Sequence, residues 1–239
     1  SGRSIGTLHL TMFELGKSAK RKELLKELES KLGAERFLEL ILRNGTLFEL
    51  FRVLQYSTPS FAQSLLSAME KGKAEELLQK TIASGRSIGT LDLAMFELGK
   101  TVEGKELLAK LESKLGAARF LDLIMCNGTL VDLFRVLHHC TPSFAKLLLS
   151  ALIEDKAKFL VHKTISAGRS IGTLHMTLFE LGKTAEGKDL QEELETKLGS
   201  LNFLELILRN GSLFELFSAL RYSTPRFAHS LLSALNEEK

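Results

Sequence analysis

Three times this chain carries the same heptapeptide, first as Gly2-Arg3-Ser4-Ile5-Gly6-Thr7-Leu8 and then at residues 85–91 and 168–174. The interval is 83 residues in both cases, and the match continues through nearly every residue between the copies. Self-similarity at a fixed period is the signature of a repeat architecture. The sequence therefore predicts three repeat units, at residues 1–83, 84–166 and 167–239, of which the third lacks its last helix.

A weaker repeat lies inside each unit, because Gly45-Thr46-Leu47 echoes Gly6-Thr7-Leu8. Each half is predicted to hold three helices with connections of only a few residues, so that sequential helices pack as neighbours. We therefore expect an all-α fold: a tandem helical-repeat α-solenoid, in one continuous domain, of three 83-residue units, each made of two three-helix half-units. In period and helicity alone this resembles armadillo repeats, since their residue signature is not found.

Helix boundaries follow from capping residues and apolar periodicity. In the first unit the first three helices are expected at about residues 4–15, 19–32 and 34–43. The fourth follows Thr46, the fifth follows Thr58-Pro59 and the sixth covers about residues 73–83. Three glycines are expected to end helices, the first of them in the left-handed conformation: Gly16, Gly33 and Gly85.

Two cap motifs recur in every unit. Thr46 with Glu49 forms a capping box that is repeated as Thr129 with Asp132 and as Ser212 with Glu215. Thr58 is expected to accept from the first amides of the fifth helix, where Pro59 fits the first turn. The Asn-Gly pairs at residues 44, 127 and 210 also match the glycosylation sequon, but their place between helices favours turn chemistry.

The predicted core follows the apolar stripes of the helices. The first and fourth helices are apolar over most of their circumference, so we expect them to be buried on several sides. The second helix carries a stripe of leucines at positions 24, 25, 28 and 32. Core positions, with their equivalents 83 and 166 residues later, are Leu8, Met12, Leu28, Phe37, Ile41, Leu47, Phe51, Leu54, Phe61 and Leu65.

Composition limits the classes of function. The net charge is +3, from 32 Lys and Arg against 29 Asp and Glu, which is too small to imply a nucleic-acid or membrane partner by field strength alone. Two cysteines at non-repeated positions indicate no disulfide framework. No signal peptide or apolar run of transmembrane length is found, so a cytoplasmic protein without a membrane partner is expected.

One cation at the same place in each unit would form a row along a solenoid surface. Candidate partner-binding residues are Arg3, Arg86 and Arg169, together with Lys17, Lys100 and Lys183. Such a row could grip an acidic peptide or a nucleic-acid backbone. The alternative, which we favour, is that each arginine stabilises the end of the preceding helix or pairs with Glu14, Glu97 or Glu180.

No constellation for catalysis, cofactor or metal binding is found. The glycine-rich heptapeptide lacks the strand and the Gly-Lys-Ser/Thr of a phosphate-binding loop. His138, His139 and Cys140 are adjacent on a helix, so their side chains point in different directions, and no histidine has metal-ligand spacing. The remaining carboxylates fit surface partners of lysine. We therefore predict that the chain is not an enzyme and uses no cofactor.

The predicted function is a non-catalytic binding scaffold, in which a repeat surface holds a protein or peptide partner. The alternative is nucleic-acid backbone binding along the Arg and Lys rows, against which we set the near-neutral charge and an expected lack of exposed aromatic side chains for base stacking. Because neither end reads as a polar cap, we also expect a piece of a longer array whose ends associate head to tail.

Overall fold

The computed structural model describes residues 8–168, 170–172 and 174–237, and this part of the chain contains helices and no strand. The all-α prediction is confirmed for these residues. The helices are α1 (Leu8–Gly16), α2 (Ala19–Leu32), α3 (Ala34–Asn44), α4 (Leu47–Tyr56), α5 (Pro59–Ala68), α6 (Lys71–Ala83), α7 (Gly89–Leu98), α8 (Val102–Leu115), α9 (Ala117–Asn127), α10 (Leu130–His139), α11 (Pro142–Ala151), α12 (Glu154–Ser166), α13 (Leu174–Leu181), α14 (Ala185–Leu198), α15 (Ser200–Asn210), α16 (Leu213–Tyr222) and α17 (Pro225–Glu237).

Helix bounds recur at intervals of 83 residues. The helices α2, α8 and α14 each have 14 residues and begin at residues 19, 102 and 185. The predicted bounds of 19–32 are confirmed, α3 ends one residue beyond the prediction, and α6 begins two residues before it. Whether the three predicted units superpose, and whether they form one continuous solenoid domain, stays a prediction.

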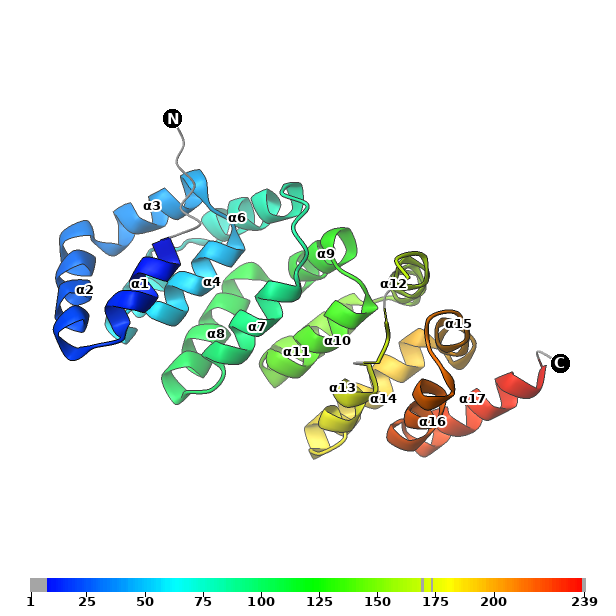
Figure 1. Cartoon of the computed structure of the whole chain (residues 1–239). Coiled ribbons are helices and arrows are strands. Elements are labelled where there is room, and N and C mark those ends of the chain that lie inside the picture. Colours follow the sequence, from blue (N-terminus) through cyan, green and yellow to red (C-terminus); the bar gives the residue numbers. More distant parts are fainter. Residues whose placement is uncertain (1–7, 169, 173, 238–239) are drawn as a thin grey trace. The chain divides into compact units, whose positions relative to one another are not determined.

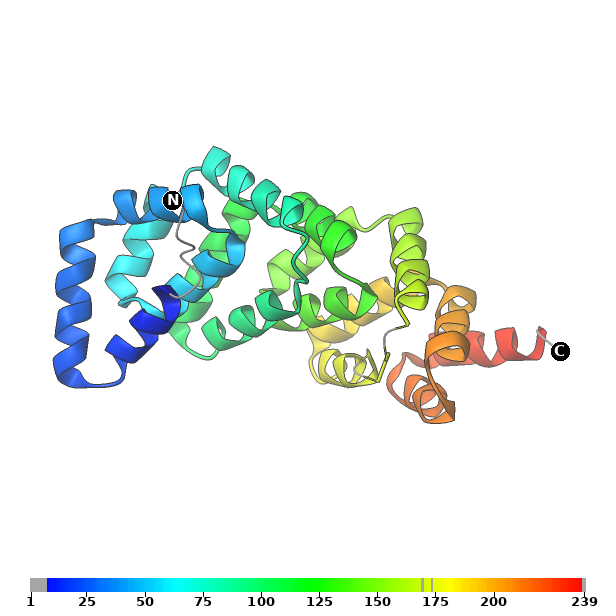
Figure 2. The same ribbon diagram turned by 45° about the horizontal axis from the view of Figure 1, so that its top comes forward.

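The chain divides into two compact units. Unit 1 comprises residues 1–127 and 139–141, and unit 2 comprises residues 128–138 and 142–239. In unit 1, α4 packs between α1 and α7, while α5 and α6 pack against α8 (Figure 1 and Figure 2). In unit 2, α11 and α12 pack against α14, and α17 packs against α15 and α16.

Glycines end two of the helices in the predicted way. Gly33 has a φ of 71° and Gly85 a φ of 63°, a region in which a Cβ atom would be strained. Gly16 does not have a positive φ, so the prediction of a left-handed cap there is wrong. Its counterpart Gly99 stays in the right-handed region and donates its N–H to the Met95 carbonyl, so this turn closes without a left-handed residue.

Asparagine side chains close two further helix ends. Asn127 Nδ2 donates to the carbonyls of Thr81 and Ile82, at the end of α6, at 3.0 and 3.1 Å. Asn210 bonds the corresponding carbonyls at the end of α12. These bonds satisfy carbonyls that have no partner within their own helix, a role that the sequence did not reveal.

Most of the predicted core is buried. Phe37, Ile41, Leu47 and Phe51 have almost no exposed surface. Leu28 is an error, because 38% of it is exposed, whereas Leu111 and Leu194 at the same repeat position are fully buried. The reason is local packing: α8 is covered by α5 and α6, and α14 by α11 and α12, while α2 packs mainly against α1 and α3.

The last copy departs from the predicted core in the same manner. Leu213 and Phe217 are largely exposed, although their counterparts Leu47 and Phe51 are fully buried. The helix α7 packs along α4, and no described helix occupies the corresponding place beside α16. The periodicity of the sequence marks an apolar face, but the neighbouring helix decides whether that face is buried.

Candidate interaction surface

A buried glutamate links the second helix of each predicted unit to the start of the fifth. Glu29 on α2 accepts from the Thr58 N–H at 2.9 Å and from the Thr58 hydroxyl. The pairs Glu112 with Thr141 and Glu195 with Thr224 make the same bonds. These glutamates are buried, so the general expectation that carboxylates are surface partners of lysine fails for them, although it is confirmed for Glu23 with Lys26 and for Glu27 with Lys31. The expected cap is also wrong at Thr58, whose hydroxyl donates to Glu29 rather than accepting from α5.

The bonds between Glu29 and Thr58 fix the chain just beyond a pair of aromatic rings, of which one, Phe13, is exposed. Two residues before Thr58, the Tyr56 ring lies 5.2 Å from the Phe13 ring, centroid to centroid. Lys17 Nζ lies 4.5 Å from the centroid of the Phe13 ring, where the ring quadrupole attracts it. We call this arrangement an aromatic–lysine cluster. It joins the end of α1 to the end of α4, within unit 1.

The cluster occurs once in every predicted repeat unit. In the second copy the Phe96 and His139 rings are 5.0 Å apart, and Lys100 lies 4.5 Å from Phe96. In the third copy, in unit 2, the Phe179 and Tyr222 rings are 5.1 Å apart, and Lys183 lies 4.5 Å from Phe179. The geometry is thus constant, although tyrosine is replaced by histidine in the second copy.

The phenylalanine rings of the clusters are accessible to a partner. Phe13, Phe96 and Phe179 are 41%, 42% and 40% exposed. We expected the first helix of each unit to be buried on several sides, and this prediction is wrong for the side that carries the phenylalanine. The expected lack of exposed aromatic side chains is wrong as well. The signal available in the sequence was the position of Phe13, well off the stripe that faces the core.

The candidate lysines are all in these clusters, and each is paired. Lys17, Lys100 and Lys183 contact Glu14, Glu97 and Glu180 at 2.5, 2.6 and 2.5 Å. These glutamates were expected to pair with arginine instead. Exposed pairs of this kind contribute little stability, but they offset the positive charge of each cluster.

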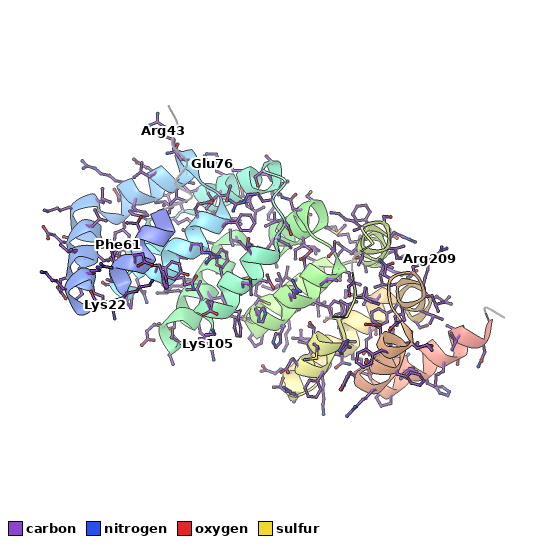
Figure 3. All side chains as sticks on the ribbon, viewed as in Figure 1. Lys22, Arg43, Phe61, Glu76, Lys105 and Arg209 are labelled. Atoms are coloured by element: carbon purple, nitrogen blue, oxygen red, sulfur yellow. The ribbon has the colours of Figure 1, made fainter. Side chains whose placement is uncertain are left out.

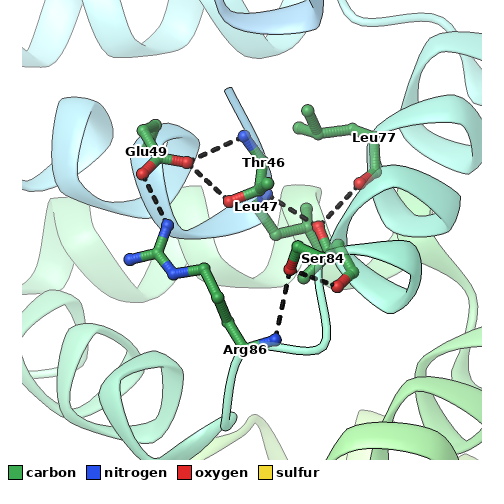
Figure 4. Close-up of polar contacts among 7 residues, drawn as sticks. Thr46, Leu47, Glu49, Leu77, Ser84 and Arg86 are labelled. Atoms are coloured by element: carbon green, nitrogen blue, oxygen red, sulfur yellow. Dashed lines mark hydrogen bonds and ion pairs between the residues drawn. The ribbon is translucent and has the colours of Figure 1, made fainter. Parts of the chain in front are cut away.

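Arg86 is the candidate arginine that the described residues include, because Arg3 and Arg169 lie outside them. Its guanidinium donates to Glu49 at 2.9 Å and lies 4.4 Å from the centroid of the Phe48 ring. Figure 4 shows Arg86 and Glu49 beside the loop that connects α6 and α7. Its carboxylate partner is on α4, and not the Glu97 that was expected.

Glu49 is shared between Arg86 and the cap of α4. The Thr46 N–H donates to its second carboxylate oxygen at 2.8 Å, which confirms the predicted capping box. Burial raises the pKa of Glu49, but the bonds from Thr46 and Arg86 outweigh it and the pKa is lowered. Arg86 therefore has a structural role, because it pairs with the glutamate that caps α4.

Cys140 does not have the environment of a nucleophile. Burial, followed by the nearby Glu112 carboxyl, raises the pKa of its thiol well above the usual value, whereas reactive cysteines have a lowered pKa. Burial likewise lowers the pKa of His138. Within the part of the chain described, no group of three or more His, Cys, Asp or Glu side chains could hold a metal ion.

Comparison of the chain with family models, with curated proteins and with solved structures finds no match. Among the helices described, none is long and apolar enough to cross a membrane. The aromatic–lysine clusters, and the helices that hold them, are therefore the features that point to a function.

Proposed function

We propose that the chain is a non-catalytic scaffold that binds a protein or peptide partner through its aromatic–lysine clusters. The observation that carries the proposal is the recurrence of one exposed arrangement in every predicted repeat unit. Interface residues that contribute most to affinity are typically aromatic or arginine side chains surrounded by packed neighbours. Each cluster offers an aromatic ring of that kind on rigid helices, with a paired lysine at its edge.

The proposal includes the arrangement of the units. If the 83-residue units form a continuous α-solenoid, the clusters become a row of similar sites with a constant spacing. A partner that contacts several sites gains affinity because the later contacts are intramolecular. Differences such as His139 in place of tyrosine would then make each site slightly different from the next.

Nucleic-acid binding is the second candidate, and the exposed rings favour it more than the sequence suggested. Bases stack on aromatic side chains, and lysine beside the ring can contact phosphate. Against it stands the charge of the candidate cations: Lys17, Lys100, Lys183 and Arg86 each have a carboxylate partner. A surface that binds phosphates needs cations that neutralise them and so release the counterions of the nucleic acid.

A peptide selection tests the proposal. Random 12-residue peptides displayed on phage would be selected on the whole chain, and the affinities of enriched peptides measured by fluorescence anisotropy. The change is the triple variant Phe13→Ala, Phe96→Ala and Phe179→Ala. We expect a loss of affinity of at least about tenfold, since one truncated anchor alone can cost more than 1 kcal/mol.

The control variant removes exposed apolar side chains outside the clusters, at Leu40, Leu147 and Phe159, and should leave affinity unchanged. Thermal unfolding checks that both variants fold. Labelled oligothymidylate and oligouridylate serve as nucleic-acid probes between 50 and 200 mM salt. Tight binding of these probes with a steep decline as salt rises would replace the scaffold proposal by the nucleic-acid one.

A further inference from the structure

Unit 1 contains a cavity next to its first aromatic–lysine cluster. It has a volume of about 820 Å³ and lies between the end of α1, the first half of α2 and the start of α5. Phe13, Tyr56 and Pro59 contribute apolar walls, and Met12 and Leu25 lie deeper. The volume is in the range of small-molecule and peptide side-chain sites.

At the junction of α1 and α2, the first copy lacks a glycine that both other copies have. Where the first copy has Arg21, the others have Gly104 and Gly187. A Cβ atom at Gly104 would lie 1.9 Å from the Leu98 carbonyl oxygen, and one at Gly187 would lie 2.0 Å from that of Leu181. The start of α8 and the start of α14 therefore approach the preceding helix as only glycine allows. Because Arg21 has a side chain, the first turn of α2 cannot make this approach to the end of α1.

Two other distances differ between the first copy and the others at this junction. The N-cap bond from the Arg21 N–H to Ser18 Oγ is 3.4 Å, whereas the equivalent bonds of Gly104 and Gly187 are 3.0 Å. A Cβ atom built on Gly16, which lines the cavity, would meet nothing within 4 Å. At the equivalent Gly182 it would lie 3.3 Å from the side chain of Gln191.

The rim of the cavity is basic. Lys17, Lys22 and Lys26 line it. Lys17 and Lys26 pair with glutamates of their own helices at 2.5 and 2.9 Å, while no described carboxylate is within 4 Å of the Lys22 ammonium. Figure 3 places Lys22 near the start of α2, and Lys105 at the corresponding place on α8.

Lys26 has no basic counterpart in the other copies, where the residue is Ala109 or Glu192. The residue before Arg21 is likewise Lys20 in the first copy and glutamate in the others. The combination of a basic rim with an apolar interior is thus particular to the first copy. It is complementary in charge to an acidic ligand with an apolar part.

Two residues that line the cavity have polar atoms without a hydrogen-bond partner. Gln55 Oε1 and Ser57 Oγ are buried without a hydrogen-bond partner, and both residues line the cavity. Buried polar atoms are normally paired, so each such atom calls for an explanation. Ser223 Oγ, at the position equivalent to Ser57 in the third copy, is likewise buried without a partner.

We propose that this cavity binds an acidic peptide segment by one aromatic or aliphatic side chain, with a carboxylate of the segment at Lys22, the lysine of the rim that has no ion-pair partner among the described residues. This inference rests on the proposed scaffold function, for which it names one site and the chemistry of its partner. The apolar side chain enters between Phe13 and Tyr56. The carboxylate remains at the basic rim, in water.

Filling the cavity tests the site. In Gly16→Phe, the new ring enters open space, and the backbone there does not require glycine. The matched control is Gly72→Phe on α6, where a Cβ atom also meets nothing within 4 Å and the residue is exposed away from the cavity. Peptides selected on the whole chain should include acidic sequences with one apolar residue. Their affinity should fall at least tenfold in Gly16→Phe and stay unchanged in Gly72→Phe.

A second pair of variants tests the origin of the cavity. Arg21→Gly should let α2 approach α1 and weaken the same peptides, whereas Arg21→Gln retains a side chain and should weaken them less. Acidic peptides that bind Gly16→Phe and the wild-type chain equally, or a selection without acidic sequences, would overturn the cavity proposal. If the selected peptides instead depend on Phe96 and Phe179, which lie outside the cavity, the scaffold function stands while this site fails. A selection that enriches no peptide would count against both.

Discussion

At the scale of single residues, the buried glutamates show what the sequence could and could not predict. The repeat placed Glu29, Glu112 and Glu195 at equivalent positions. The general expectation for carboxylates on these helices was an exposed ion pair with a lysine. Their true partners are threonines 29 residues later in the chain. Local spacing predicts contacts within a helix, but a bond between two helices depends on packing that periodicity does not encode.

Glu112 makes stability depend on pH. Burial raises the pKa of its carboxyl from 4.5 to about 7, against the opposing effect of the bonds from Thr141. The folded chain holds this proton more tightly than the unfolded chain does. The stability from this group is therefore complete below about pH 4.5 and is lost as pH rises to about 7.

The variant Glu112→Gln should remove this dependence, because its amide retains an acceptor for the Thr141 N–H without a charge. Between pH 5 and pH 8 the free energy of unfolding of the wild-type chain should fall by up to about 3 kcal/mol relative to the variant. Denaturant unfolding of both proteins at these two pH values measures the difference. Parallel pH profiles would contradict the buried-carboxyl explanation.

At the scale of helices, caps and boundaries were predicted well because their signals are local. Gly33 and Gly85 end helices, and Thr46 with Glu49 begins one, as the residues indicated. The junction between α1 and α2 was not predicted. The consequence of Arg21 appears only when the close approach at Gly104 is known.

That close approach gives a pair of substitutions with opposite signs. Gly104→Ala should destabilise the chain by about 1–3 kcal/mol, as is typical when an atom is forced into packed structure, because its Cβ would lie 1.9 Å from the Leu98 carbonyl oxygen. Gly72→Ala, with open space around it at the second residue of α6, should stabilise the chain by at most about 0.5 kcal/mol, because the gain of about 0.5–1 kcal/mol applies to the middle of a helix. Thermal unfolding of both variants checks this, and equal effects would show that α8 can shift to make room.

At the scale of the whole molecule, the first copy exposes a face of α2 and the third copy a face of α16 that are buried on the equivalent helices of the other copies. Leu24 and Leu28 on α2 are exposed, while their counterparts on α8 and α14 are buried. Phe214 and Phe217 on α16 are about two-thirds exposed, although Phe48 and Phe51 on α4 are buried. Since α4 packs against α7 within the chain, we expect α16 of one molecule to pack in the same way against α1 of another molecule.

Sedimentation velocity over a wide range of concentrations measures this association. The wild-type chain should form larger species as concentration rises, and the double variant Phe214→Lys and Phe217→Lys should remain monomeric, because lysine cannot be buried there without a partner. Substituting two exposed apolar residues elsewhere, Leu147→Lys and Phe159→Lys, is the control. A wild-type chain that stays monomeric throughout would contradict the expectation.

The proposed scaffold function requires that a partner contact the exposed rings of the aromatic–lysine clusters. Fluorine NMR tests it most directly, with trifluoromethyl-phenylalanine placed singly at residue 13, 96 or 179, and at the exposed Phe159 of α12 as a reference. The peptide with the highest affinity for the whole chain would then be added to each labelled protein. We expect the resonance to shift at one or more of the cluster positions and to stay unchanged at Phe159. Unchanged resonances at all three cluster positions, with the peptide demonstrably bound, would contradict the account.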